Sequence, residues 1–217
     1  MRVWTLPCLL GWAASGCLAA PEDVAEWTEA AVDVGPSRVY FFDGFFVHLE
    51  VPALSRALEQ LQQHLDEHHP GTTLARWHQT LWRSVCDEIR ALPEAEMPAH
   101  VALLGHSFGV GAAMDTASCL AGRTVELVVS IDSVTRLQTP TQDVVPENVL
   151  VSPNFFQEQG ILRGSQDNHR ADGTYRGITN TRIEVPSTFS PHYGIVNELV
   201  DSGRLQALLD EALSASR

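Results

Sequence analysis

Basic residues are scarce in this chain. It carries 14 Lys and Arg residues against 27 Asp and Glu residues, which gives a formal net charge of −13 at pH 7. Nucleic-acid binding depends on basic side chains that neutralise phosphates, so this balance argues against nucleic acid as a partner. The acidic residues are scattered along predicted helices, a pattern typical of solvated faces, and we interpret the acidity as a contribution to solubility.

Long hydrophobic runs are missing as well. The most apolar segment follows Arg2 and covers about 15 residues, which is short for a membrane span. Small residues and then acids come after it, the order of an export signal; the alternative is a buried N-terminal helix or strand. The sequence therefore predicts a signal peptide over residues 1–20, one domain over residues 21–217, and an exported protein.

Two cleavage sites compete at the end of this signal. Cleavage after Leu18-Ala19-Ala20 would release a soluble periplasmic or secreted protein. Ala14-Ser15-Gly16-Cys17 resembles the lipobox of bacterial lipoproteins, and cleavage before Cys17 would leave that residue lipidated and the protein anchored to a membrane. The sequence leaves both outcomes open.

Cysteine is rare, and only Cys86 and Cys119 remain once the signal is removed. An oxidising compartment would permit them to pair; the alternative is two small buried side chains on helices. Their spacing does not resemble a metal site. A histidine cluster, His64, His68 and His69, lacks the acid of a HExxH motif, so it predicts a polar helix end with at most incidental metal affinity.

Apolar runs and helical patterns alternate along the chain. Each strand is short and continuously apolar, as strands of a sheet buried on both faces are. This order predicts an α/β fold with a mostly parallel sheet and helices on both faces. The expected strands are 38–42, 101–104, 125–131, 148–152 and 182–185, and the expected helices are 24–32, 54–65, 74–89, 110–120 and 195–213.

The most specific motif is Gly105-His106-Ser107-Phe108-Gly109, a GxSxG sequence between a buried strand and a helix rich in small residues. Such a sequence arises by chance in a chain of this length with a probability on the order of a tenth, so its position between strand and helix is what gives it weight. In a nucleophile elbow the turn is so sharp that small residues must flank the serine. The motif predicts Ser107 as a nucleophile.

A serine hydroxyl needs an imidazole base, and that imidazole needs an acid that fixes its tautomer. Asp132 directly follows the predicted strand 125–131 and therefore lies at the same sheet edge as Ser107, although it could instead cap a turn. His192 follows the last predicted strand in a loop before the final helix. The predicted triad is Ser107, Asp132 and His192, with Asp167, Asp172 and His169 as weaker alternatives.

The backbone amides of Phe108 and Phe45 are the expected oxyanion donors. The first follows the nucleophile, and the second lies in the loop after the first strand, the two places from which this kind of site takes its donors. Many α/β-hydrolases, which this chain resembles through the motif at 105–109, have His-Gly in that loop. This chain has Asp43-Gly44 there, so it differs from that pattern in the first residue of the pair.

From about Val39 to Val200 the chain resembles the α/β-hydrolase superfamily, particularly its small bacterial lipase, esterase and thioesterase-like members. The resemblance rests on GHSFG at 105–109, on Asp132 at a strand end, on VSPNFFQ at 151–157 and on SPHYGIV at 190–196. The order Ser, Asp, His along the chain is that of the superfamily, and an acid placed this early resembles certain lipases.

The resemblance implies a serine hydrolase that cleaves carboxylic esters of small-molecule or lipid acyl substrates without a cofactor. A thioesterase or an acyltransferase would use the same triad, and a non-catalytic binding lipoprotein could keep the same fold. Phe45, Phe46, Phe108, Phe155 and Phe156 could line an acyl pocket or belong to the core, and the segments 138–147 and 162–179 could shape its rim.

Overall fold

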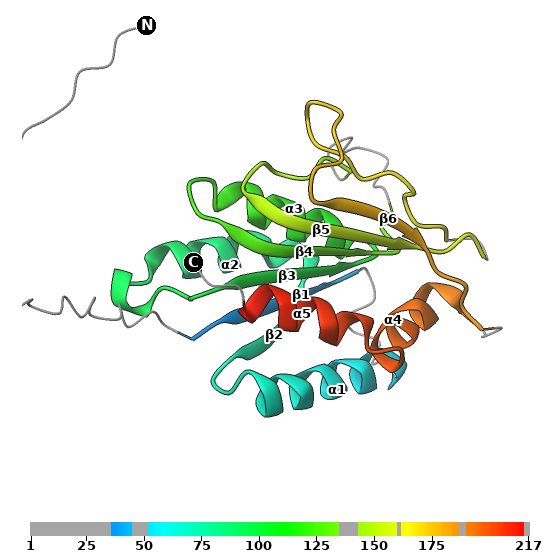
Figure 1. Ribbon diagram of the computed structural model, residues 1–217, viewed down its shortest axis with the longest axis horizontal. Helices are drawn as coiled ribbons and strands as arrows, with labels where there is room; N and C mark the ends of the chain where they lie inside the picture. The colour runs from blue at the N-terminus through cyan, green and yellow to red at the C-terminus, as the bar shows by residue number, and fades with distance from the viewer. Residues whose placement is uncertain (1–35, 45–51, 135–142, 160–161, 187–189, 215–217) are drawn as a thin grey trace, which may run out of the picture. The chain divides into compact units, whose positions relative to one another are not determined.

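The computed structural model describes residues 36–44, 52–134, 143–159, 162–186 and 190–214 (Figure 1). The predicted helix 24–32 and the predicted signal peptide lie outside these residues. No helix in the described ranges is long and apolar enough to cross a membrane.

Six strands form one sheet, and every ladder between them is parallel. Their order across the sheet is β2-β1-β3-β4-β5-β6. The two central strands, β3 and β4, are buried along their whole length, as their unbroken apolar sequences predict. The strands are β1 (Arg38–Asp43), β2 (Thr73–His78), β3 (Val101–His106), β4 (Val125–Ile131), β5 (Val149–Phe156) and β6 (Ile178–Arg182).

Helices cover both faces of the sheet (Figure 1). One face carries α1 (Pro52–His68), α4 (Pro191–Asp201) and α5 (Arg204–Ser214), which also contact one another; the other carries α2 (Trp82–Ala91) and α3 (Gly109–Cys119). Two short 3₁₀ segments, Gln79–Leu81 and Glu94–Glu96, flank α2. The fold is the predicted α/β arrangement of parallel strands with helices on both faces.

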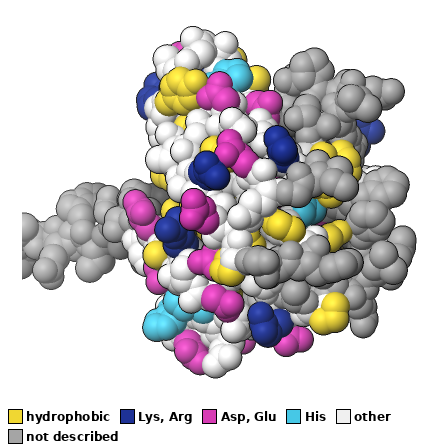
Figure 2. Space-filling model, turned by 90° about the vertical axis from the view of Figure 1, so that its right-hand side faces the viewer, with side chains coloured by type: hydrophobic (Ala, Val, Ile, Leu, Met, Phe, Trp, Pro, Cys, Tyr) yellow, Lys and Arg dark blue, Asp and Glu magenta, His cyan; other side chains and the backbone are white. Residues whose placement is uncertain are grey.

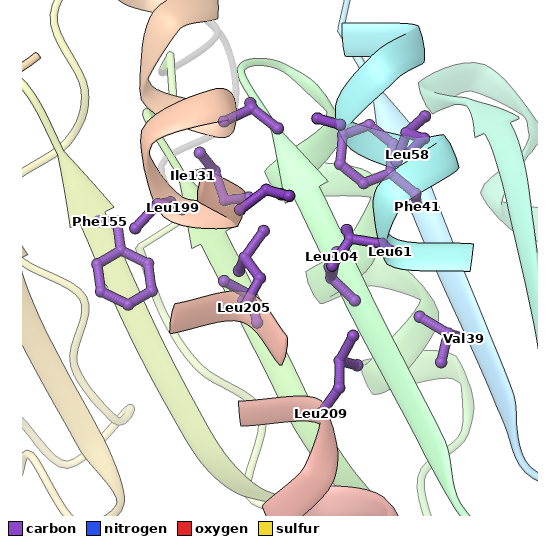
Figure 3. Packing of buried hydrophobic residues seen from close by; sticks show 14 of the residues in the cluster. Val39, Phe41, Leu58, Leu61, Leu104, Ile131, Phe155, Leu199, Leu205 and Leu209 are labelled. Carbon is purple, nitrogen blue, oxygen red and sulfur yellow. The ribbon is translucent and has the colours of Figure 1, made fainter. Parts of the chain in front are cut away.

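Alternating side chains of the strands divide the core into two clusters. Leu104 of β3 lies in the cluster under α1, α4 and α5, whereas its neighbour Leu103 lies in the cluster under α2 and α3. In the first cluster Leu61 of α1 and Leu209 of α5 are fully buried (Figure 3). Burying one such leucine contributes roughly 1.5–3 kcal/mol, so these contacts fix both helices on the sheet that carries the site.

Most of the predicted elements are confirmed, but the helix predicted over residues 74–89 is wrong in its first half. Thr73–His78 is the strand β2, and the helix α2 begins only at Trp82. Leu74 and Trp77 have the spacing of one helical face, but β2 is an edge strand of the sheet and remains partly exposed. It therefore lacks the continuous apolar run that marks the inner strands.

Two boundaries near the C-terminus also differ from the prediction. The last strand is Ile178–Arg182 rather than 182–185. Its ladder with β5 begins at Ile178, and the apolar residues Ile183 and Val185 that suggested a strand are buried in the core after it. The final helical segment begins at Pro191, so His192 lies in the first turn of α4 and not in a loop. Proline is favoured at this first helical position because it has no N–H to leave unpaired.

Cys86 and Cys119 form a disulfide, with the sulfur atoms 1.95 Å apart. It joins α2 to α3 across 33 residues of sequence. Of the two alternatives open from the sequence, the structure has the bonded pair.

Candidate active site

Ser107 occupies a sharp turn between β3 and α3. Its backbone has a φ of +58°, a left-handed conformation that is rare for a residue with a side chain. The turn brings the start of α3 against the strands: a Cβ added at Gly109 would lie 2.0 Å from the Phe42 carbonyl oxygen, and one at Gly105 would lie 2.5 Å from the Val110 Cα. Glycine is therefore required on both sides of Ser107, as a nucleophile elbow demands.

Asp132 lies at the end of β4, the strand next to β3, and its side chain contacts His192. Its Oδ2 accepts a hydrogen bond of 2.5 Å from His192 Nδ1, and the Asp132 side chain is fully buried. Since the carboxylate can only accept, Nδ1 carries the proton and Nε2 is left with the lone pair that a general base needs. Residue 132 also has a positive φ, +46°, so the strand end turns sharply here too.

Gln157, at the end of β5, completes the surroundings of this carboxylate. Its side-chain Nε2 donates to Asp132 Oδ2 at 2.9 Å, and its backbone N–H donates to Oδ1 at 3.3 Å. On the opposite side Gly164 approaches so closely that an added Cβ would lie 2.4 Å from Asp132 Oδ1. The carboxylate is thus held from several directions in one orientation.

His106 also holds His192 in place. It is fully buried, its Nε2 donates to the backbone carbonyl of His192 at 2.8 Å, and the two imidazole rings lie 4.6 Å apart. Its Nδ1 faces Asp43 Oδ1 at 4.0 Å, and Asp43 in turn forms an ion pair with Arg76 of β2. Side chains of β1, β2 and β3 thus form a row of charged and polar groups that reaches the His192 ring.

One pocket connects these groups. It is lined by Ser107 and His192 together with Asp43, Gly44, His106, Phe108, Leu162 and Tyr193. Gly44 lies directly against Ser107, because a Cβ at this position would lie 2.9 Å from Ser107 Cβ and 3.1 Å from its Oγ. Figure 2 views the molecule from the side that lies on the right of Figure 1, where hydrophobic and histidine side chains lie close together near the middle of the face.

In the pocket, burial and nearby partners have opposite effects on the pKa of His192, and likewise on the pKa of Asp43. Burial lowers the pKa of His192 below its ordinary 6.5 and outweighs the hydrogen bond that His192 donates to Asp132, which by itself would raise it. Burial by itself would raise the pKa of the Asp43 carboxyl, but His106 and Arg76 lower it below its ordinary value. At neutral pH the site therefore holds a neutral His192 beside an ionised Asp43.

The expected oxyanion donors lie partly outside the described residues. Phe108 follows Ser107 at the start of α3 and lines the pocket, at the positive end of the helix dipole. Phe45 and Phe46 lie outside the described residues, so the role of Phe45 stays a prediction. Its neighbour Gly44 donates its own N–H to Asp43 Oδ1 at 2.7 Å, which fixes the start of the loop.

No family model matches the chain, and no curated protein matches it. Its structure is similar to that of Est1E from Butyrivibrio proteoclasticus, at 13% identity and a TM-score of 0.50 over 82% of this chain and 89% of that one. It is also similar to the esterase domain of a Rhodothermus marinus protein, at 14% identity and a TM-score of 0.46 over 78% of this chain and 85% of that one. A third similar structure is RedJ with a PEG molecule bound in its active site, at 14% identity and a TM-score of 0.48 over 84% of this chain and 95% of that one.

The chain has the α/β-hydrolase fold. Within this fold Ser107, Asp132 and Gln157 come from three neighbouring strands, β3, β4 and β5, and all three lie at the carboxyl edge of the parallel sheet. That edge is where open α/β sheets bind their ligands. The fold thus gives the three side chains a common location without the help of long loops.

The weaker candidates for the triad lie elsewhere on this α/β-hydrolase fold. Asp167 is exposed and accepts a hydrogen bond from the Tyr175 hydroxyl, while Asp172 is exposed and accepts one from the Thr174 backbone N–H. His169 takes part through its backbone in a bridge with Val144. These three residues do not line the pocket that holds Ser107.

The aromatic residues named as acyl-pocket candidates divide between pocket and core. Phe108 lines the pocket, whereas Phe155 belongs to the hydrophobic cluster under α4 and α5. Phe156 is also buried, beside Gly164. Leu162, at the start of the predicted rim segment, does reach the pocket.

In the described part of the chain, no group of three or more His, Cys, Asp or Glu side chains is arranged to hold a metal ion. His64 and His69 instead both hydrogen-bond one oxygen, Oδ1 of Asp210, at 2.7 and 2.8 Å. Burial by itself would raise the pKa of Asp210, but the two histidines lower it below its ordinary value. The histidine cluster therefore joins the end of α1 to α5.

Two parts of the site were missing from the sequence reasoning. Gln157 appeared only as the last letter of a resemblance motif, and the link of His106 to Asp43 and Arg76 was not anticipated. The predicted strand 148–152 ended before Gln157, because Pro153 and Asn154 interrupt the apolar run of β5, so the rule that identified Asp132 did not point to Gln157. For Arg76 the sequence offered no signal, since its strand was interpreted as helix.

Proposed function

We propose that this protein is a serine hydrolase that cleaves carboxylic esters through an acyl-enzyme intermediate, with Ser107 as nucleophile, His192 as base and Asp132 as acid. The observation that carries the proposal is the left-handed backbone of Ser107 at the β3–α3 turn, in one pocket with a His192 whose Nδ1–H is held by Asp132. Backbone strain of this kind persists where a site requires it.

In the proposed mechanism His192 Nε2 removes the Ser107 hydroxyl proton as Oγ attacks the ester carbonyl carbon. The negative charge that develops on the carbonyl oxygen is stabilised by backbone amides, for which we assign Phe108 and, from the prediction, Phe45. His192 then gives its proton to the leaving alcohol, and the acyl group stays on Oγ. Water activated by His192 releases the acid and restores Ser107.

The buried carboxylate of Asp132 supports both proton transfers. It holds the imidazole in the tautomer that leaves Nε2 unprotonated, and it stabilises the imidazolium that forms during attack. Because burial depresses the pKa of His192, the imidazole is ready as a base at neutral pH. The chemistry of these residues supports acyl transfer, and the ester as substrate is our proposal from the resemblance, since a fold alone does not fix a function.

We further propose that the protein is exported, with residues 1–20 as its signal peptide or with Cys17 as a lipid anchor. The disulfide between Cys86 and Cys119 supports an oxidising location, because such bonds persist outside the reducing cytosol. Radiolabelled palmitate fed to cells that make the protein distinguishes the two exported forms. Label that is lost with Cys17→Ser supports the anchor, and unlabelled mature protein supports free release.

The experiment that tests the function is labelling of the purified protein with a fluorophosphonate, which reacts with activated serines. Mass spectrometry should locate the adduct on Ser107, and Ser107→Ala should abolish both labelling and turnover while the protein stays folded. Ser118→Ala is the matched control, since Ser118 is an exposed serine of the adjoining helix α3. Folded wild-type protein that does not react would overturn the proposal.

A second measurement separates the reactions that share this triad. Turnover of an aryl ester and its thioester counterpart, each with and without added alcohol, identifies the acyl donor and the acceptor. Hydrolysis of the ester as the dominant reaction supports the proposal, whereas preferential formation of a new ester with the alcohol would assign an acyltransferase.

A further inference from the structure

Gln157 is a fully buried polar residue at the carboxyl end of β5, next to the strand that carries Asp132. A buried amide is costly unless its polar atoms are paired. The hydrogen-bond partners of Gln157 explain why a polar residue stands here, directly after the apolar pair Phe155-Phe156.

Every polar atom of the Gln157 side chain has a partner. Nε2 donates to Asp132 Oδ2 at 2.9 Å and to the backbone carbonyl of Leu162 at 2.5 Å, and Oε1 accepts from the backbone N–H of Gln159 at 2.5 Å. The amide orientation follows from these partners, because a carboxylate and a carbonyl only accept, and a backbone N–H only donates. Turning the amide over would break all three hydrogen bonds.

Two of these partners belong to the active site. Asp132 Oδ2 is the same oxygen that accepts the hydrogen bond from His192 Nδ1, and Leu162 lines the pocket beside Ser107. One amide group therefore joins the triad acid to a residue of the pocket wall. Its two N–H bonds diverge from a single nitrogen, so a displacement of Leu162 changes the donor that reaches Asp132.

We propose that Gln157 is a positioning residue of the triad, which orients the Asp132 carboxylate toward His192 and links that orientation to the pocket wall at Leu162. The kinetic tests of this inference rest on the proposed function, because they measure turnover. Gln157 does not touch the reacting atoms and acts through Asp132.

The neutral amide matters as much as its geometry. Asp132 Oδ2 already accepts a hydrogen bond from His192 Nδ1. The neutral amide adds a second hydrogen bond that stabilises the negative charge, and it does not compete with Asp132 for the proton on Nδ1. An ionised carboxylate in place of the amide would put one of its oxygens where Nε2 now lies, against Asp132 Oδ2 and the Leu162 carbonyl. These three oxygens are all acceptors, and no donor would lie between them. Two carboxylates so close share a proton, and the pKa of one of them rises strongly.

This difference gives a specific test, the pH profile of Gln157→Glu. While the introduced carboxyl is protonated it donates to Asp132 as the amide does, so activity persists. As the pH rises and that proton is lost, the two carboxylates repel each other and activity falls. We therefore expect a descending limb that the wild-type profile lacks in the same pH range, and a profile of unchanged shape would overturn the proposal.

The second variant is Gln157→Met, which keeps the length of the side chain without its hydrogen bonds. Loss of a hydrogen bond to a charged group should lower kcat on the order of tenfold or more, with a much smaller change in KM because substrate contacts are kept. Gln166→Met is the matched control, since Gln166 is exposed and donates to Glu158, away from the triad. Equal kcat values for the two methionine variants would refute the role of Gln157.

A readout without turnover keeps this proposal separate from the function. The proton between His192 Nδ1 and Asp132 should give a far-downfield resonance in ¹H NMR, and Gln157→Met should shift or broaden it while Gln166→Met does not. If wild-type protein fails to react with a fluorophosphonate, the proposed hydrolase function fails, but this resonance still tests the positioning of Asp132. A resonance that is the same in all three proteins would overturn the inference.

Discussion

Replacing Asp132 by asparagine is the most informative perturbation of the site, because the carboxylate faces only donors. His192 Nδ1 and Gln157 Nε2 both donate to Oδ2, and the Gln157 backbone N–H donates to Oδ1. An amide offers one acceptor oxygen and an NH₂ group. Whichever way it is oriented, the NH₂ group meets an N–H donor, and the imidazolium loses its counter-charge.

We expect Asp132→Asn to lower kcat by about 10⁴-fold, the magnitude found when the acid of a serine protease triad is replaced in this way. At about 1.4 kcal/mol for each factor of ten, this corresponds to about 5 kcal/mol of transition-state stabilisation. The hydrogen bond of 2.5 Å and the complete burial of Asp132 favour so large an effect, because water cannot take the place of the lost charge.

The assay is hydrolysis of a short-chain aryl ester, with thermal unfolding measured in parallel to verify that the variant is folded at the assay temperature. Asp167→Asn and Asp172→Asn are the controls, since both residues are exposed acids that the sequence left as alternatives. They should keep near-normal turnover. A folded Asp132→Asn protein within tenfold of wild-type activity would refute the assignment of the triad acid.

Two further predictions concern pH and the disulfide. Because burial lowers the pKa of His192, kcat/KM should stay level as the pH falls from neutrality and decline only as it passes through that depressed pKa, with a midpoint below 6.5; a midpoint above 6.5 would contradict the buried, neutral base. Replacing Cys86 and Cys119 together by serine should lower the free energy of unfolding by roughly 3–4 kcal/mol, the chain-entropy value for a loop that spans 33 residues. Denaturant titration measures it, and reduced wild-type protein should match the double variant.

The central part of the fold could be predicted because its strands are buried on both faces. Such strands are continuous apolar runs, and residues 125–131 form β4 as predicted. The elbow at Ser107 was predictable for a related reason, since the crowding around Gly105 and Gly109 leaves glycine as the residue that fits. Where burial or steric crowding allows only certain residues, those residues can be recognised in the sequence and the structure can be predicted from them.

Features that depend on one exposed side or on a distant partner were not predictable in this way. The edge strand β2 is only half covered, so its residues follow no strand pattern, and the spacing of Leu74 and Trp77 favoured a helix. Arg76 pairs with Asp43 across two strands, which the sequence cannot bring together without the correct register. The same limit applied to Gln157, whose role depends on its place beside Asp132.

The geometry of the site follows from the register of the sheet more than from its loops. The Ser107 N–H donates to the Ile131 carbonyl, and the Asp132 N–H donates to the Phe155 carbonyl, so ladder hydrogen bonds continue past the strand ends. Ser107 and Asp132, the proposed nucleophile and acid, are thus fixed to each other through β4 and β5. A site built on rigid elements keeps its geometry better than one built on loops.

His192 is the one member of the proposed triad that does not follow a strand, and residues of two strand ends hold it. Asp132 of the β4 edge binds its ring, and His106 of β3 binds its backbone carbonyl. Both contacts are buried, so neither is weakened by competition with water. His192 therefore depends on the sheet for its position, although α4 carries it.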